Sequence, residues 1–88
     1  MSQKERELTQ DEVVALAEKY LARHQPAHYR LKVLREGVRR DDDWWYVVVQ
    51  PDREDVYSYE YYGRLAEAEL DLEEAEHLHV LLVPTLPG

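Results

Sequence analysis

Most apolar residues in the first third of the chain recur at steps of three and four, the spacing of one helix face. These positions are Val13, Leu16, Ala17, Tyr20, Leu21 and His24. Thr9 and Glu12 precede all of them as a capping box, in which each side chain can accept a hydrogen bond from the other's backbone amide. Pro26 disfavours helical geometry at the residue before it. The pattern predicts a helix that begins after Thr9 and ends at Gln25.

Residues 28–50 have the pattern of a β-hairpin. Tyr29, Leu31 and Val33 occupy every second position, as residues on one face of a strand do. Gly37 predicts a bulge in this strand. A polar turn is expected at residues 39–43. The following run, WWYVVVQP at 44–51, is apolar on both sides, which is typical of a strand that is central or covered on both faces.

Four tyrosines crowd residues 57–62, and their spacing fits either a strand or a helix. The helical pattern is the longer one and comprises Tyr57, Tyr61, Leu65, Ala68, Leu72 and Ala75. Ala, Glu and Leu also favour helix over residues 64–76. We therefore predict a helix over residues 58–76, while a short extended segment before Gly63 stays open.

The same helix carries a second apolar stripe on its other side, formed by Tyr59, Tyr62, Ala66 and Leu70. A helix that lies on one sheet needs only one such stripe, so the second predicts another contact surface. Tyrosines can also stack on a ligand. Amphipathic packing accounts for this cluster more simply, because half of it already belongs to the helical stripe.

The last apolar run, residues 78–84, predicts a strand buried on both faces and ended by Pro84. The element order is then α-β-β-α-β. We expect an α+β fold in which two helices pack on one face of a three-stranded sheet. Residues 8–88 would form this single domain, with residues 1–7 as a flexible tail.

The other face of this sheet would be bare, and the second strand would place either Trp44 and Tyr46 or Trp45 and Val47 on it. An exposed aromatic face on a chain of 88 residues predicts a homodimer, or a contact with another protein. A dimer could form by pairing two sheets or two third strands. The expected interface residues are Trp44, Trp45, Tyr46, Tyr59, Tyr62 and Leu70.

Charge is unevenly distributed along the chain, whose net charge is −8. Residues 26–40 carry five Lys and Arg against one Glu, whereas residues 41–88 carry two against thirteen Asp and Glu, a balance of −11. An acidic chain is repelled by phosphate backbones, which argues against nucleic acid as a partner. The absence of cysteine, of a membrane-length apolar run and of a signal-peptide pattern predicts a soluble cytoplasmic protein.

Candidate chemistry is sparse. Two histidine pairs, at 24/28 and 77/79, lack the further ligands that a zinc site needs, and the acidic run at 41–43 lacks the spacing of a calcium loop. No glycine-rich phosphate loop and no thiol nucleophile is present. We therefore predict no catalytic residue, no cofactor and no metal. The alternative is a small enzyme or ligand-binding protein with a pocket lined by Tyr57, Tyr61 and His79.

Three segments, WWYVVVQP, YEYYGRLAEAELDLEE and VLLVPTLPG, resemble in type and order a group of small uncharacterised bacterial α+β proteins. The resemblance covers the C-terminal half of the chain. The segment ELTQDEVVALAEKYLA is also similar to the first helix of small bacterial immunity-type domains. The sequence as a whole predicts a non-enzymatic protein–protein interaction or assembly module, with an acidic immunity- or antitoxin-like binder as one form of it.

Overall fold

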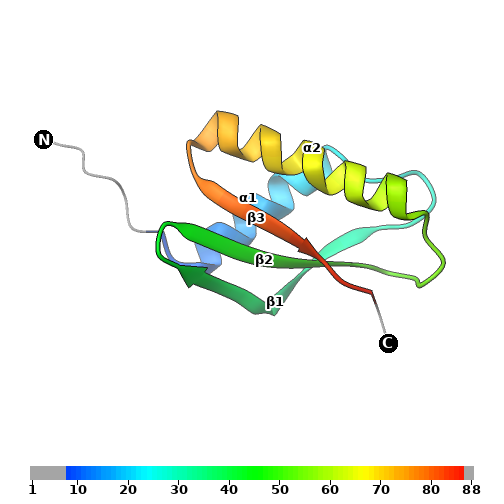
Figure 1. Ribbon diagram of the computed structural model, residues 1–88, viewed down its shortest axis with the longest axis horizontal. Coiled ribbons are helices and arrows are strands. Elements are labelled where there is room, and N and C mark those ends of the chain that lie inside the picture. The colour runs from blue at the N-terminus through cyan, green and yellow to red at the C-terminus, as the bar shows by residue number, and fades with distance from the viewer. Residues whose placement is uncertain (1–7, 87–88) are drawn as a thin grey trace, which may run out of the picture.

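The computed structural model describes residues 8–86, which form two helices and a three-stranded sheet (Figure 1). In chain order the elements are α1 (Gln10–Ala22), β1 (Leu31–Asp41), β2 (Trp44–Pro51), α2 (Ser58–Glu76) and β3 (His79–Pro84). The predicted α+β class and the order α-β-β-α-β are confirmed. The predicted tail at residues 1–7 lies outside the described residues, as do residues 87–88.

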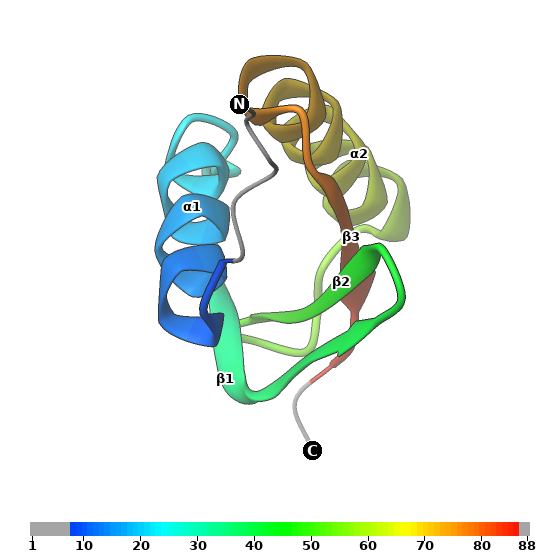
Figure 2. The ribbon, with the colours of Figure 1, turned by 90° about the vertical axis from the view of Figure 1, so that its left-hand side faces the viewer.

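The strand order is β1-β2-β3, with β2 antiparallel to β1 and parallel to β3. The prediction that WWYVVVQP is a central strand is therefore confirmed. A parallel pair needs a crossover, and α2 supplies it. Viewed end on, both helices lie on one side of the sheet, α1 near β1 and α2 near β3 (Figure 2).

Helix α1 begins at the predicted capping box: the Thr9 hydroxyl accepts from the Glu12 amide at 3.1 Å, and the Glu12 carboxylate accepts from the Thr9 amide at 2.9 Å. Its buried side chains are Val13, Val14, Ala17, Tyr20 and Leu21. The helix ends three residues before the predicted Gln25. The amides of Arg23 and His24 bond carbonyls three residues back, which tightens the last turn and closes the helix.

The turn of the β1–β2 hairpin is shorter than the predicted residues 39–43, since β1 continues to Asp41 and only two residues separate the strands. Asp42 has φ 58°, a left-handed conformation that Asp tolerates better than most residues. The predicted bulge is present, because the pairing shifts between Leu34 and Arg39. Within the shifted segment, a Cβ on Gly37 would lie 2.7 Å from Val48 Cγ2, so this position requires a residue without a side chain.

Helix α2 has the predicted bounds, and it buries Tyr61, Leu65, Ala68 and Leu72. The prediction that Tyr57 and Ala75 belong to this buried stripe is wrong, because both are exposed at the ends of the helix. The prediction that β3 is buried on both faces is also wrong. As an edge strand with helices on one side only, β3 buries Val80 and Leu82 and exposes His79 and Leu81.

Candidate functional site

The sheet face that points away from the helices carries the clearest candidate surface. Val47 and Val49 are fully buried beneath the helices, so the alternate residues of β2 must point the opposite way. Cross-strand partners share a face, which assigns residues of β1 and β3 to the same side. We call this surface the open face; it comprises Lys32, Leu34, Arg39, Asp41, Trp44, Tyr46, Val48, Gln50, His79, Leu81 and Val83.

Apolar and aromatic side chains dominate the open face, and no helix within residues 8–86 lies over it (Figure 2). Trp44 is 39% exposed and Leu81 is 38% exposed, values at which large apolar side chains remain in contact with water. Of the two alternatives predicted for the bare face, the pair Trp44 and Tyr46 is the one found there. Exposed apolar area of this kind is typical of a protein-binding surface.

Two ring contacts hold aromatic side chains of the open face in place. The Trp44 and His79 rings lie with centroids 4.8 Å apart and planes inclined by 33°. The Arg39 guanidinium carbon lies 5.4 Å from the centre of the Tyr46 ring, within the range of a cation–π contact. Side chains that are already ordered lose less conformational entropy when a partner binds.

Trp45, which was expected at an interface, does not belong to the open face. It is half-buried and packs against the core on the helix side of the sheet. The guanidinium of Arg40 lies 5.7 Å from the centre of its ring on that side. Trp45 is thus part of the folded core, and only the alternation of the strand separates it from its neighbours Trp44 and Tyr46.

A second exposed surface runs along α2. Tyr59 is 96% exposed, Tyr62 is 54% exposed and Leu70 is 57% exposed, and Ala66 between them is exposed as well. We call these four residues the α2 stripe. They lie on the side of α2 that faces away from the sheet, next to the side where Asp71 and Glu67 meet His24. Their exposure shows that the core of the domain does not use these side chains. The further contact surface predicted for them stays a prediction.

The free edge of β3 is partly covered by α2. The Glu69 carboxylate accepts a hydrogen bond from the Leu82 amide at 2.7 Å. Burial raises the pKa of Glu69 above its usual value, although the same hydrogen bond opposes that shift. Pro84 ends the strand and has no amide to donate. Together these two features reduce the capacity of this edge to pair with another strand.

Arginines of the basic segment at residues 26–40 contact other parts of the same fold. Arg35 forms an ion pair with Asp11 at the start of α1. Arg40 donates to the Asp42 carbonyl oxygen at 3.0 Å. Arg39 stays at the open face over Tyr46. These three arginines are therefore directed to different parts of the fold and do not form one phosphate-binding patch.

Polar contacts join the two helices. The Tyr20 hydroxyl donates to Glu76 at 2.8 Å, and this hydrogen bond is the main cause of the raised pKa of Tyr20. His24 lies 2.7 Å from an Asp71 oxygen and 3.3 Å from a Glu67 oxygen. These five side chains fix α1 against α2, and a structural role accounts for all of them.

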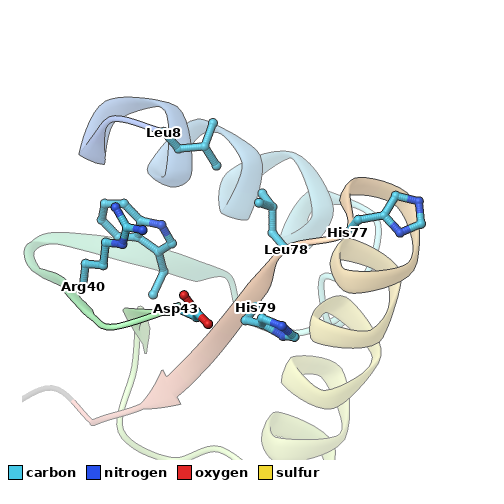
Figure 3. A pocket seen from close by; sticks show the side chains of 7 residues that line it. Leu8, Arg40, Asp43, His77, Leu78 and His79 are labelled. Atoms are coloured by element: carbon cyan, nitrogen blue, oxygen red, sulfur yellow. The ribbon is translucent and has the colours of Figure 1, made fainter. Parts of the chain in front are cut away.

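A hollow of about 280 Å³ lies where the end of the hairpin meets the start of β3. Leu8, Arg40, Asp43, Trp45, His77, Leu78 and His79 line it. In the close view, the imidazole of His77 extends away from the other side chains (Figure 3). In residues 8–86 no group of three or more His, Cys, Asp or Glu side chains is placed to hold a metal ion.

The pocket predicted from Tyr57, Tyr61 and His79 is not formed. Tyr61 is buried and its hydroxyl contacts the backbone of Val49 and Thr85 at the end of β3. His79 is at the other end of that strand, stacked on Trp44, and Tyr57 is exposed at the start of α2. Three side chains placed so far apart cannot converge on one small ligand.

Comparison of the chain with protein-family models, with curated proteins and with solved structures found no match. Neither α1 nor α2 has the length and apolarity required to cross a membrane. A function for the chain is therefore inferred from its own surfaces, the open face and the α2 stripe.

Four apolar residues of the open face were not among the predicted interface residues: Leu34, Val48, Leu81 and Val83. Glu69 was also missed, because its contact with the Leu82 amide depends on the packing of α2 against β3. The alternation of apolar residues in β3 was a usable signal for Leu81 and Val83. It could not be interpreted without knowing that β3 is an edge strand with one bare side.

Proposed function

We propose that this protein is a non-enzymatic assembly module that binds a second copy of itself through the open face. The observation that carries the proposal is the uncovered row of Trp44, Tyr46 and Leu81 across neighbouring strands. Transfer of apolar surface out of water is worth about 25 cal/mol per Å², so covering such a face favours association. An enzyme has less support, because the polar side chains between the helices have a structural role and because Tyr57, Tyr61 and His79 do not form a pocket.

Solution mass measured by light scattering over a 100-fold range of concentration tests this proposal. The wild-type protein is expected to form species larger than the monomer as the concentration rises. The variant Leu81→Glu puts a charge on the open face beside Tyr46 and should stay monomeric, because burying an unpaired carboxylate is costly. Tyr57→Lys, exposed and outside both surfaces, is the control and should associate as the wild type does.

A wild-type protein that remains monomeric at every concentration would overturn self-association. Association of Leu81→Glu with unchanged affinity would instead show that the copies meet elsewhere. Circular dichroism spectra of each variant would establish that the helices are retained, so that loss of association is not confused with loss of the fold.

The acidity of residues 41–88, with its balance of −11, favours a second candidate, an immunity- or antitoxin-like protein that covers a basic partner. A synthetic amphipathic peptide rich in lysine and leucine is a suitable probe. Its affinity should fall steeply between low and high salt, since exposed charges are screened within about 10 Å at 0.1 M. Binding that does not change with salt would contradict this candidate.

A further inference from the structure

We propose that the open face of one copy is covered by the α2 stripe of the next copy, so that copies join head to tail. This inference rests on the self-association proposed above and names the surface of the second copy that takes part. Two exposed apolar surfaces of one chain, carrying opposite charge, are the basis for it.

The charges around the two surfaces differ in sign. Lys32 and Arg39 lie on the open face against one acidic residue, Asp41, at its hairpin end. On α2, Glu69 and Glu73 lie beside the stripe at helical spacing. Although the chain is strongly acidic, the open face is thus locally cationic.

Arg64, the one cationic residue of α2, does not reverse the negative charge around the stripe. Arg64 lines the same hollow as Tyr59 at the start of the helix, but its guanidinium is 3.5 Å from Glu67, whose carboxylate also contacts His24 of α1. The stripe is therefore bordered by carboxylates where a partner would approach it. Contact between an apolar surface rimmed by cations and one rimmed by anions is favourable on both counts.

Symmetric alternatives fit less well. Two open faces packed against each other would bring Lys32 and Arg39 of both copies to the same interface, and two α2 stripes would do the same with Glu69 and Glu73. Pairing of two β3 edges would require each Glu69 to release the Leu82 amide, and it would place the two carboxylates close together. The head-to-tail contact avoids all three costs.

The two surfaces also match in size. The stripe from Tyr59 to Leu70 is about 16 Å long at a rise of about 1.5 Å per residue. The outward residues of β2, from Trp44 to Gln50, extend about 20 Å. Three strands are about 10 Å across, close to the diameter of one helix of about 10 Å. One α2 helix can therefore cover the open face.

A contact between different surfaces leaves the open face unused on one end copy and the α2 stripe unused on the other. Such heterologous contacts continue until the chain of copies closes into a ring or extends as a filament. The solution mass should then rise beyond that of a dimer as the concentration increases. A symmetric contact would stop at the dimer.

A mixing experiment with two blocked variants tests the arrangement. Leu81→Glu damages the open face and leaves the stripe intact, whereas Leu70→Lys damages the stripe and leaves the open face intact. Both positions are exposed, so the fold should be retained. Each variant alone should be monomeric. A 1:1 mixture should form a species of twice the monomer mass that grows no further, because only one intact contact remains.

The possible outcomes separate this inference from the proposed function. If the wild type associates but the mixture stays monomeric, the intact open face of one variant does not bind the intact stripe of the other, and the head-to-tail arrangement is wrong. If Leu70→Lys associates as the wild type does, the stripe is not involved. If the wild type never associates, both proposals fail. Arg39→Glu provides a second blocked face, and Tyr57→Lys serves as the control that should leave association unchanged.

Discussion

At the scale of single residues, Tyr61 shows how one member of a tyrosine cluster becomes structural. Its hydroxyl lies 2.7 Å from the Val49 carbonyl oxygen and 2.8 Å from that of Thr85, and it accepts from the Thr85 amide at 3.0 Å. One hydroxyl thus ties the ends of β2 and β3 together beneath α2. Because a hydroxyl group has one proton, it can donate to only one of the two carbonyls at a time.

Tyr61→Phe should lower the free energy of unfolding by about 1–3 kcal/mol, since it leaves buried backbone groups without this partner. Urea unfolding followed by tryptophan fluorescence would measure the loss. Tyr62→Phe, at the exposed neighbouring position, is the matched control and should change stability by less than about 0.5 kcal/mol. Equal effects of the two variants would contradict the role given to the Tyr61 hydroxyl.

The two internal glycines should respond to alanine in opposite directions. At Gly37 a new Cβ would lie 2.7 Å from Val48 Cγ2, so Gly37→Ala should destabilise the fold by about 1–3 kcal/mol through overpacking. At Gly63 nothing lies within 4 Å, so Gly63→Ala should stabilise α2 by about 0.5–1 kcal/mol. The same unfolding assay measures both. Stabilisation by Gly37→Ala would show that the bulge can shift to accept a side chain.

At the scale of elements, the helices were the most predictable parts of the structure. The capping box and the three- and four-residue steps are local signals, and they placed the start of α1 and both ends of α2. The exposure of β3 was not predictable in this way. Alternation separates the two sides of a strand, but it does not say which side a helix will cover or whether the strand is at an edge.

The contact between α2 and β3 gives a prediction about pH. Glu69 has a raised pKa because it is partly buried, with Glu73 adding to the shift, so the folded chain holds this proton more tightly than the unfolded chain does. Its stabilising contribution is complete below the ordinary value of 4.5 and is lost as the pH rises through the raised pKa.

Glu69→Gln removes the ionisation but retains an oxygen that can accept from the Leu82 amide. Relative to the wild type, the variant should therefore gain free energy of unfolding as the pH rises from about 4 to 7. Chemical denaturation at several pH values measures this difference. Glu74→Gln, an exposed position on the same helix, is the control. A difference between Glu69→Gln and wild type that is constant with pH would contradict the raised pKa.

At the scale of the whole molecule, the sequence supported the existence of a bare sheet face but not its full composition. Trp44 and Tyr46 were expected as one of two alternatives, and the burial of Val47 decides between them. Leu34 joins the face through the register of the hairpin, which depends on the irregular segment around Gly37. Register and edge position are set by contacts between distant residues, so no local pattern could supply them.

Self-association has a consequence for thermal stability that does not depend on which surfaces meet. A partner that binds only the folded state stabilises it by mass action, by about 2.7 kcal/mol when its concentration is 100 times Kd. For a domain of this size, each kcal/mol shifts Tm by about 4–8 °C. The Tm of the wild type should therefore rise by about 10–20 °C over a 100-fold increase in concentration above Kd. The Tm of Leu81→Glu should stay constant, because that variant has no intact open face to cover. Differential scanning calorimetry at matched concentrations makes the comparison. If the two proteins gave the same concentration dependence, the open face would not be the surface through which the copies meet.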